Sequence, residues 1–428
     1  MRTATAARRA ALAILGAVRT GTPFGEARDR HLGGLAERDR RLAYELSAGV
    51  LRRQAELDRT LDLTRADPRL HDVLRLGAYQ LRCLTRVPPH AAVATSVELA
   101  RETAGEGPAR FVNQALRKLT GVGYRVSGAG STHPEWLVRR WEARFGKADT
   151  QRLLTWNDTK PALTLQPARW DRETLARRLH ESGVRVTEAP LGAGLHINPV
   201  PGTRHPIPSQ LPGFSEGGFI VQDPAHALVC RFAAIPAGAR VYDACAAPGG
   251  KAVALEAAGA RVVAGDARRD RLPRLAETAR RAGVAIRSLA ADLEAAPFAP
   301  GCFDAVLVDA PCSATGTMAR HPDARWRLDP GVFARAAARQ ARLVAAAAPL
   351  VRPGGLLIYA TCSLEPDENT AVVEDFVSRH PEFSRAPVAP LLRGAVPAEL
   401  LTAAGDFQSL PQRHGIDGAY AARLARRA

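Results

Sequence analysis

The spacing of apolar residues changes along this chain of 428 residues, and the change divides it into a helical part and a part of alternating strands and helices. In the helical part, apolar residues recur at the spacing of one helix face in segments 10–18, 42–51, 73–84, 91–103 and 111–119. Clusters of proline and glycine separate these segments, as they do between helices. The pattern predicts an all-helical bundle over residues 1–125.

A glycine- and serine-rich stretch at residues 121–131 predicts the end of this bundle. A helix is expected to begin near His133, where a proline follows in the first turn. Residues 162–166, 171–182 and 184–188 then have the patterns of a strand, a helix and a strand, and the Pro- and Gly-rich stretch 190–212 is expected to be loop. We predict a small α+β connecting subdomain at residues 131–215.

From residue 216 onward, short apolar strands alternate with helices. The strands are expected at 241–243, 261–265, 286–289, 305–308 and 356–359, and the helices at 252–258, 269–282 and 331–351. Strands that alternate with helices form a parallel sheet that is covered on both faces. A last apolar run at 418–424 is expected to add an edge strand. Residues 216–428 are thus predicted to form one α/β domain.

The charge of the chain favours a polyanionic partner. The formal net charge is +16, and residues 1–150 contain 26 basic and 16 acidic side chains, so the basic excess is concentrated at the amino-terminal end. A cationic surface gains affinity for nucleic acid because binding releases counterions from the phosphates. We therefore expect nucleic acid as the partner, bound by the helical bundle through backbone phosphates.

The six cysteines include no C-x-x-C pair and no spacing typical of a metal site. Their spacing, in a chain of this length, is not that of a disulfide framework, which agrees with a reducing compartment. No apolar run reaches the roughly 18–20 residues that span a bilayer. We expect a cytoplasmic protein without a membrane segment or a metal ion.

Three predicted strands end in residues suited to bind an adenosyl ligand. The first runs into Asp243-Ala-Cys-Ala-Ala-Pro-Gly-Gly-Lys251, whose small residues let the backbone approach a ligand. Asp266 and Asp292 end the next two, and they are placed to reach ribose hydroxyls and an adenine edge, although a single acid there is more often a helix cap. The turn is neither a Walker phosphate loop nor G-x-G-x-x-G, and nothing nearby neutralises a pyrophosphate. The pattern favours S-adenosylmethionine over a dinucleotide.

Two cysteines follow later strands of the same predicted sheet, Cys312 in Asp309-Ala-Pro-Cys312-Ser and Cys362 in Tyr359-Ala-Thr-Cys362-Ser. Ligands of open α/β sheets bind at the carboxyl ends of the strands, so both thiols are expected beside the cofactor. Carbon 5 of cytosine is too electron-poor to accept a methyl cation, whereas addition of a thiolate to carbon 6 makes carbon 5 nucleophilic. A carboxylate near ring nitrogen N3, such as Asp309, would support that addition. The residues alone leave open which thiol attacks.

These motifs resemble those of the RNA cytosine-C5 methyltransferases of the Nol1/Nop2/Sun family. The matching stretches are 245–251, 309–316 (Asp-Ala-Pro-Cys-Ser-Ala-Thr-Gly), 320–326 (Arg-His-Pro-Asp-Ala-Arg-Trp) and 359–369, and residues 217–228 are similar to the family's entry into its catalytic domain. The amino-terminal part resembles a NusB-like helical domain in segments 75–81, 87–90 and 111–117. This pairing is similar to bacterial methyltransferases of small-subunit ribosomal RNA. The resemblance implies a Rossmann-like, S-adenosylmethionine-dependent methyltransferase domain preceded by a NusB-like bundle.

The resemblance also implies roles for single residues. Cys362 would be the nucleophile and Cys312 would help to release the product, whereas the Pro-Cys cysteine of DNA cytosine methyltransferases attacks, which would point to Cys312. The implied S-adenosylmethionine site consists of Cys245, Ala246, Ala247, Pro248, Gly249, Gly250, Lys251, Asp266, Asp292 and Asp309. Asp309 and Lys251 would also face the base. One departure is Asp417-Gly-Ala-Tyr420 in place of the family's Asp-Gly-Phe-Phe, which affects the expected packing of that strand rather than the chemistry.

We predict an enzyme that forms 5-methylcytosine in RNA, with 16S ribosomal RNA as the expected substrate. Because the base must leave its stack to reach Cys362, a single-stranded or loop target is expected. Two other hypotheses stay open. A DNA cytosine methyltransferase would act on duplex DNA and would use a glutamate motif that is not found downstream of Cys312. A non-catalytic RNA-binding or assembly factor would not need the two cysteines.

Overall fold

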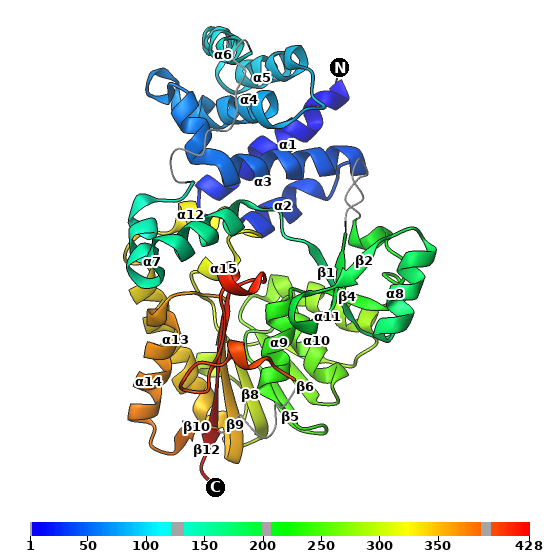
Figure 1. The fold of residues 1–428 in the computed structure, drawn as a ribbon, viewed down its shortest axis with the longest axis vertical. Helices are drawn as coiled ribbons and strands as arrows, with labels where there is room; N and C mark the ends of the chain where they lie inside the picture. Colours follow the sequence, from blue (N-terminus) through cyan, green and yellow to red (C-terminus); the bar gives the residue numbers. More distant parts are fainter. Residues whose placement is uncertain (1, 121–131, 199–206, 387–394) are drawn as a thin grey trace. The chain divides into compact units, whose positions relative to one another are not determined.

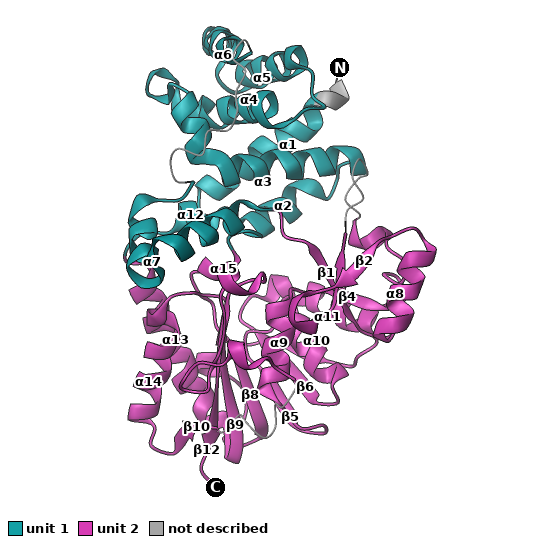
Figure 2. Ribbon diagram, viewed as in Figure 1, with its two compact units in different colours: residues 1–159, 318–330 teal, residues 160–317, 331–428 magenta. Residues whose placement is uncertain are grey.

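The computed structural model describes residues 2–120, 132–198, 207–386 and 395–428, and it divides into two compact units (Figure 2). Unit 1 comprises residues 1–159 together with 318–330, and unit 2 comprises residues 160–317 and 331–428. The chain therefore leaves unit 2 at residue 318 and returns to it at residue 331. The boundary predicted at residues 121–131 lies outside the described residues, and the three predicted domain limits stay predictions.

Unit 1 is helical, as the apolar spacing predicts (Figure 1). Its helices are α1 (Arg2–Arg19), α2 (Phe24–Leu32), α3 (Glu37–Thr60), α4 (His71–Cys83), α5 (Pro89–Ala104), α6 (Glu106–Leu119), α7 (Glu135–Asp158) and α12 (Ala324–Arg327). Proline stands in the first turn of α5, where its missing N–H is not needed. Gly105 separates α5 from α6 with a φ of 91°, which favours glycine because it has no Cβ.

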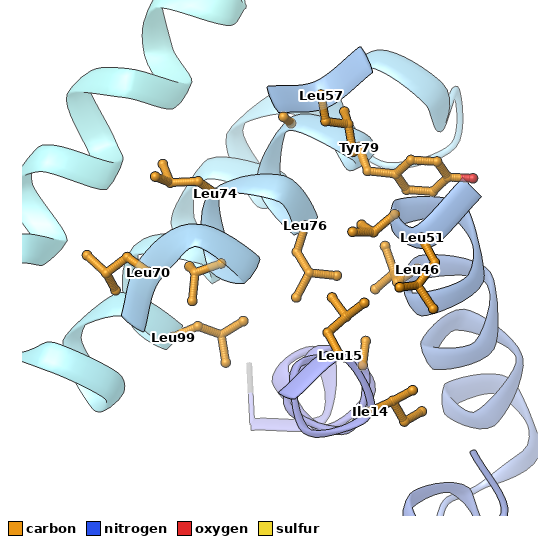
Figure 3. Packing of buried hydrophobic residues seen from close by; sticks show 14 of the residues in the cluster. Ile14, Leu15, Leu46, Leu51, Leu57, Leu70, Leu74, Leu76, Tyr79 and Leu99 are labelled. Carbon is orange, nitrogen blue, oxygen red and sulfur yellow. The ribbon is translucent and has the colours of Figure 1, made fainter. Parts of the chain in front are cut away.

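The core of the helical unit is built from aliphatic side chains that point between α1, α3, α4 and α5 (Figure 3). Leu15, Leu46 and Leu76 are among the side chains that meet there, and each is almost completely buried. Gly49 on α3 faces the ring of Tyr79 on α4 so closely that a Cβ would overlap the ring. The helices can therefore approach only because position 49 has no side chain.

Segment 318–330, which follows the Cys312 motif, is held within the helical unit by buried polar contacts. The guanidinium of Arg325 is fully buried and donates to Asp158 Oδ1 at 2.8 Å and to the carbonyl of Asn157 at 2.9 Å. Trp326 donates through Nε1 to the carbonyl of Leu51 at 2.6 Å. The motif at residues 320–326 thus makes tertiary contacts in this unit, which a buried arginine requires.

Replacing Asp158 with asparagine is expected to lower the free energy of unfolding of the helical unit by about 2 kcal/mol. The substitution leaves the buried Arg325 guanidinium without its counter-charge, although the cost stays below that of a fully buried pair because the Asp158 side chain is 32% exposed. The measurement is urea unfolding followed by tryptophan fluorescence, since Trp136, Trp141, Trp156 and Trp326 lie in this unit.

The matched control for this prediction is Glu135→Gln, which breaks an exposed pair in the same unit. Glu135 and Arg139 are 82% and 65% exposed, and such pairs contribute less than about 0.5 kcal/mol. Equal midpoints for Asp158→Asn and Glu135→Gln would show that the Arg325 contact does not stabilise the unit.

Unit 2 begins with a small antiparallel sheet. Its strands are β1 (Leu163–Pro167), β2 (Val186–Glu188), β3 (Leu195–Ile197) and β4 (Phe219–Val221), in the order β2-β3-β1-β4. Helix α8 (Arg172–Glu181) buries Leu175 and Leu179 against Leu165 and Phe219 of this sheet. The prediction of a loop at 190–212 is wrong at β3. This strand has only three residues, two of them with buried side chains, which is too short to give a strand pattern in the sequence.

The second sheet of unit 2 is the predicted α/β sheet. Its strands are β5 (Arg240–Asp243), β6 (Arg261–Asp266), β7 (Arg287–Ala290), β8 (Phe303–Asp309), β9 (Val351–Thr361), β10 (Phe383–Arg385), β11 (Phe407–Ser409) and β12 (Ala419–Arg426). Their order is β10-β12-β9-β8-β5-β6-β7, with β11 paired to β12. The helices are α9 (Pro224–Ala233), α10 (Gly250–Ala257), α11 (Leu272–Ala282), α13 (Val332–Ala347), α14 (Thr370–Arg379) and α15 (Pro411–His414). Strands β5 to β9 pair in parallel, which confirms the predicted α/β class.

Helices cover both faces of this sheet (Figure 1). On one face Leu307 of β8 belongs to a core with side chains of α9, α10 and α11, and on the other Val306 and Val308 belong to a core with side chains of α13 and α14. Successive residues of β8 are thus buried on alternate faces, which explains why the strand is an unbroken apolar run.

The last strand, β12, corrects one expectation from the sequence. It was expected at the edge of the sheet, but it lies between β9 and β10 and runs antiparallel to both. The outer neighbour β10 has only three residues, so the sequence gives no signal for it. The departure at residues 417–420 is accommodated here, since Tyr420 is fully buried and donates to Asp406 Oδ2 at 2.6 Å.

The structure shows all six cysteines as free thiols. In the described part of the chain, no helix is long and apolar enough to cross a membrane. Within the same ranges, no group of three or more His, Cys, Asp or Glu side chains is placed to hold a metal ion.

Candidate active site

The candidate site lies where parallel strands of the large sheet end. Strands β6 and β7 lie on one side of β5, and β8 and β9 lie on the other, so the strand order reverses between β5 and β8. Ligands of open α/β sheets bind in the crevice outside the carboxyl ends of the strands at such a switch point. Asp243, Asp266 and Asp309 are the last residues of β5, β6 and β8, and Cys362 directly follows β9.

The two cysteines singled out from the sequence meet at this edge. Their Sγ atoms are 3.1 Å apart, although 50 residues separate them along the chain. The pKa of Cys312 is raised well above its usual value, first by the hydrogen bond to Cys362, then by burial and by the charge of Cys362. Cys312 therefore keeps its proton at neutral pH, and either sulfur of this pair can be the donor of the hydrogen bond.

An ammonium–carboxylate pair adjoins the thiols. Lys251 on α10 donates through Nζ to Asp309 Oδ2 at 2.6 Å, and its side chain is only 9% exposed. Burial acts to lower the pKa of Lys251, but Asp309 outweighs it, and Cys362 contributes in the same direction, so the net pKa is raised. Lys251 is thus a buried cation whose charge acts on the region around Cys362.

The turn after β5 packs closely against neighbouring side chains at its glycines. Gly249 has a φ of 101°, and a Cβ there would lie 2.9 Å from Leu275 Cγ. Asp243, which precedes the turn, is 1% exposed, and no side chain among the described residues donates a hydrogen bond to its carboxylate. Burial, followed by the charge of Asp309, raises the pKa of Asp243 to about 7, against the opposite effects of Lys251 and of the backbone N–H of Cys245. A buried carboxylate without a side-chain donor is suited to a cationic ligand group.

The remaining predicted site residues differ in their contacts. Asp266 accepts from the backbone N–H of Ala247 at 3.0 Å and of Arg268 at 2.8 Å, so it fixes the turn to the end of β6. Cys245 has a pKa that is raised first by burial and then by Asp243. Asp292 is exposed and caps the short helix Leu293–Ala295 by accepting from Glu294 N–H at 3.1 Å.

Two buried carboxylates of the site were not assigned from the sequence. Asp243 ends β5, and its place before a glycine turn was the available signal. Glu368 lies in the matching stretch 359–369, but its contacts depend on residues distant in sequence, so no spacing rule indicates them.

Three protein-family models match consecutive parts of the chain. Residues 5–120 match the NusB family, residues 133–200 match the ferredoxin-like domain of RsmF/B-like methyltransferases, and residues 234–425 match the family described as 16S rRNA methyltransferase RsmB/F. The predicted combination of a NusB-like bundle, a small α+β subdomain and a methyltransferase domain is confirmed.

The similarity to known proteins covers most or nearly all of the chain. The probable ribosomal RNA small subunit methyltransferase B of Synechocystis sp. is 35% identical over 419 residues, which cover 91% of this chain and 92% of that protein. The ribosomal RNA small subunit methyltransferase B of Salmonella arizonae is 33% identical over 368 residues, covering 81% and 84%. The crystal structure of PH0851 has the same fold, with a TM-score of 0.79 at 24% identity, over 97% of this chain and 98% of that one.

Proposed function

The chain belongs to the RsmB/F family of 16S rRNA methyltransferases, and from this premise we propose that it methylates carbon 5 of a cytosine in small-subunit ribosomal RNA through a covalent bond to Cys362. The observation that carries the proposal is the meeting of two thiols, 3.1 Å apart, at the carboxyl edge of the sheet. A packed pair of structural cysteines would not need a buried lysine beside it. Lys251 and Asp309 supply the charges that thiolate addition to a pyrimidine requires.

Cys362 is proposed as the nucleophile because its sulfur lies near the Lys251 cation, and the resemblance to the Nol1/Nop2/Sun family implies the same role. Its thiolate adds to carbon 6, and carbon 5 gains the electron density needed to attack a methyl group. Asp309 is proposed to contact the base and to stabilise the proton that N3 gains during this addition. Methyl transfer then leaves a proton at carbon 5, which must be removed before the Cys362–carbon 6 bond can break.

Cys312 is proposed to take part in this release. The largest cause of its raised pKa is the hydrogen bond to Cys362. Once Cys362 is bound to carbon 6, its sulfur carries no negative charge and is a weaker acceptor, so the pKa of Cys312 falls. Cys312 then becomes able to give its proton to solvent and, as a thiolate, to take the proton from carbon 5, so that the carbon 5–carbon 6 double bond re-forms and Cys362 leaves as a thiolate. The order of the two thiol reactions thus follows from their contact.

S-adenosylmethionine is the proposed cofactor, and it would supply an activated methyl group on a sulfonium. The residues proposed to hold it are those of the turn from Cys245 to Lys251, Asp266, Asp292 and Asp309. The buried carboxylate of Asp243, to which no described side chain donates, fits this ligand because S-adenosylmethionine carries a positively charged ammonium group.

Replacing Asp243 with asparagine is expected to weaken the binding of S-adenosylhomocysteine by about tenfold or more, the worth of one charge-assisted hydrogen bond. Binding by the wild type should also weaken as pH falls below about 7, where Asp243 becomes protonated, and this dependence should vanish in the variant. Isothermal calorimetry between pH 6 and pH 8.5 measures both.

Stability should change in the opposite direction. The folded state raises the pKa of Asp243 above its usual 3.8, so it favours the neutral form, and the wild type loses stability as pH rises through about 7. Asp243→Asn should therefore be more stable than the wild type at pH 8, by part of the roughly 4 kcal/mol to which such a shift corresponds. A variant that binds as the wild type does, or that is less stable at pH 8, would contradict this role for Asp243.

Ribosomal RNA is the proposed partner. The net charge of +16 and the basic excess in residues 1–150 suit a polyanion. The match of residues 5–120 to the NusB family supports RNA binding by the helical unit through phosphates. The target base must be unstacked to reach the sulfurs, so we propose a cytosine in a loop or single-stranded region.

The test of this function is nucleoside analysis after the full-length chain is incubated with 16S rRNA and a methyl-labelled donor. Label is expected in 5-methylcytidine of the RNA, and none is expected in duplex DNA. Label in another nucleoside, or in DNA, would contradict the proposed reaction. RNA that is bound but stays unlabelled would favour the non-catalytic hypothesis.

A further inference from the structure

A buried carboxylate accepts hydrogen bonds from both loops that carry the site cysteines, the one after β8 and the one after β9. Glu368, in the short helix Pro366–Glu368, is 0% exposed. Its Oε2 accepts from the backbone N–H of Ser313 at 2.9 Å and from Gln340 Nε2 at 2.9 Å, and its Oε1 accepts from the hydroxyl of Ser363 at 2.6 Å and from the hydroxyl of Ser313. Among the described residues no cation pairs with it, so its charge is held by neutral donors, an expensive arrangement to bury.

The donors are not a random set, because Ser313 directly follows Cys312 and Ser363 directly follows Cys362. We propose that Glu368 is a positioning residue for the two-cysteine reaction: it binds the serine after each cysteine and thereby sets the distance between the two sulfurs. This inference rests on the proposed function, because the distance between the sulfurs matters only if both thiols take part in the reaction. Glu368 contacts the two serines, and we do not propose that it touches the substrate.

Other contacts join the two loops directly to each other, next to this carboxylate. The hydroxyls of Ser313 and Ser363 are 3.2 Å apart, and Thr315 Oγ1 accepts from the backbone N–H of Leu364 at 2.8 Å. The N–H of Gly316 donates to the carbonyl of Cys362 at 2.9 Å, and a Cβ at Gly316 would lie 2.8 Å from that carbonyl oxygen. Of the four donors to Glu368, three belong to these two loops: the N–H and the hydroxyl of Ser313 and the hydroxyl of Ser363.

The charge of Glu368 has a second effect, on the proton of Cys312. It adds to the rise in the pKa of Cys312, after the hydrogen bond to Cys362 and burial. A negative charge close to a thiol disfavours the thiolate. Glu368 therefore holds Cys312 in place and also adds to the preference of Cys312 for its thiol form.

The test uses Glu368→Gln in the full-length chain, with Glu374→Gln as the matched control, since Glu374 is an exposed glutamate of α14. Glutamine has nearly the same size but presents an N–H group where donors already point. We expect kcat for RNA methylation to fall about 10–100-fold, because small displacements of reacting groups have effects of this size, with KM for RNA unchanged. The control should match the wild type in both constants.

A second measurement needs no RNA. Alkylation of Cys312 by iodoacetamide, followed by peptide mapping between pH 7 and pH 10, should be about three- to tenfold faster at pH 8 in Glu368→Gln, because removal of the charge lowers the pKa of Cys312. Wild-type kcat and wild-type alkylation in Glu368→Gln would overturn the inference. A wild type that makes no 5-methylcytidine but shows this alkylation difference would overturn the proposed function and leave the role of Glu368 in holding the thiols.

If Glu368→Gln does not fold, the serine variants decide the question. Ser313→Ala and Ser363→Ala each remove one hydroxyl donor and keep the carboxylate. Each is expected to lower kcat several-fold with an unchanged circular dichroism spectrum, and the effect of the double variant should differ from the sum of the two because they share one acceptor. Full activity in both serine variants would overturn the inference.

Discussion

Cys362→Ala is expected to lower the rate of RNA methylation by at least about 10³-fold, because the variant lacks the sulfur that adds to carbon 6. Without that addition, carbon 5 of cytosine stays too electron-poor to attack a methyl group. Binding of S-adenosylhomocysteine should be unchanged.

The measurement is transfer of labelled methyl groups to 16S rRNA at saturating donor, with donor binding followed separately by calorimetry. Cys302→Ala serves as the control, because Cys302 precedes β8 and so lies at the end of that strand opposite to Asp309. The control should methylate RNA at the wild-type rate. Residual methylation by Cys362→Ala within tenfold of wild type would rule out Cys362 as the nucleophile.

Cys312→Ala is expected to trap the enzyme on its RNA. Cys362 can still add to carbon 6 and the methyl group can still be transferred, but the proton at carbon 5 is not removed, so the covalent bond persists. Denaturing gels should show an RNA–protein band that accumulates to a large fraction of the enzyme, while turnover falls by about 10²-fold or more.

The double variant Cys312→Ala/Cys362→Ala distinguishes this result from non-specific crosslinking, because it should form no such band. The alternative assignment, in which the Pro-Cys cysteine attacks, predicts the reverse: trapping by Cys362→Ala and none by Cys312→Ala. A reversed pattern would exchange the proposed roles of the two thiols.

Much of the site could be predicted because the chemistry follows strand ends. β5, β6, β8 and β9 are buried on both faces, so each is a short apolar run that stands out in the sequence. Parallel pairing then brings the residues after these strands to one edge of the sheet, and Cys312 and Cys362 do meet there. Their roles in the reaction stay a prediction.

What the sequence did not reveal depends on long-range contacts or on very short elements. β3 and β10 have three residues each, too few for a periodic pattern, and the error over β12 follows from missing β10. Segment 318–330 contains a family motif, but nothing in its spacing indicates that Arg325 is buried against Asp158 in the helical unit. The same holds for Glu368, whose donors lie 5 to 55 residues away.

The most direct test of the central claim is to identify the bond itself. RNA that contains 5-fluorocytidine at the target should trap the wild-type enzyme, because fluorine cannot leave carbon 5 as a proton does. Protease digestion and mass spectrometry of the trapped complex should place the methylated nucleotide on Cys362. A nucleotide found on Cys312, or the absence of any covalent complex with an enzyme that methylates ordinary RNA, would contradict the proposed mechanism.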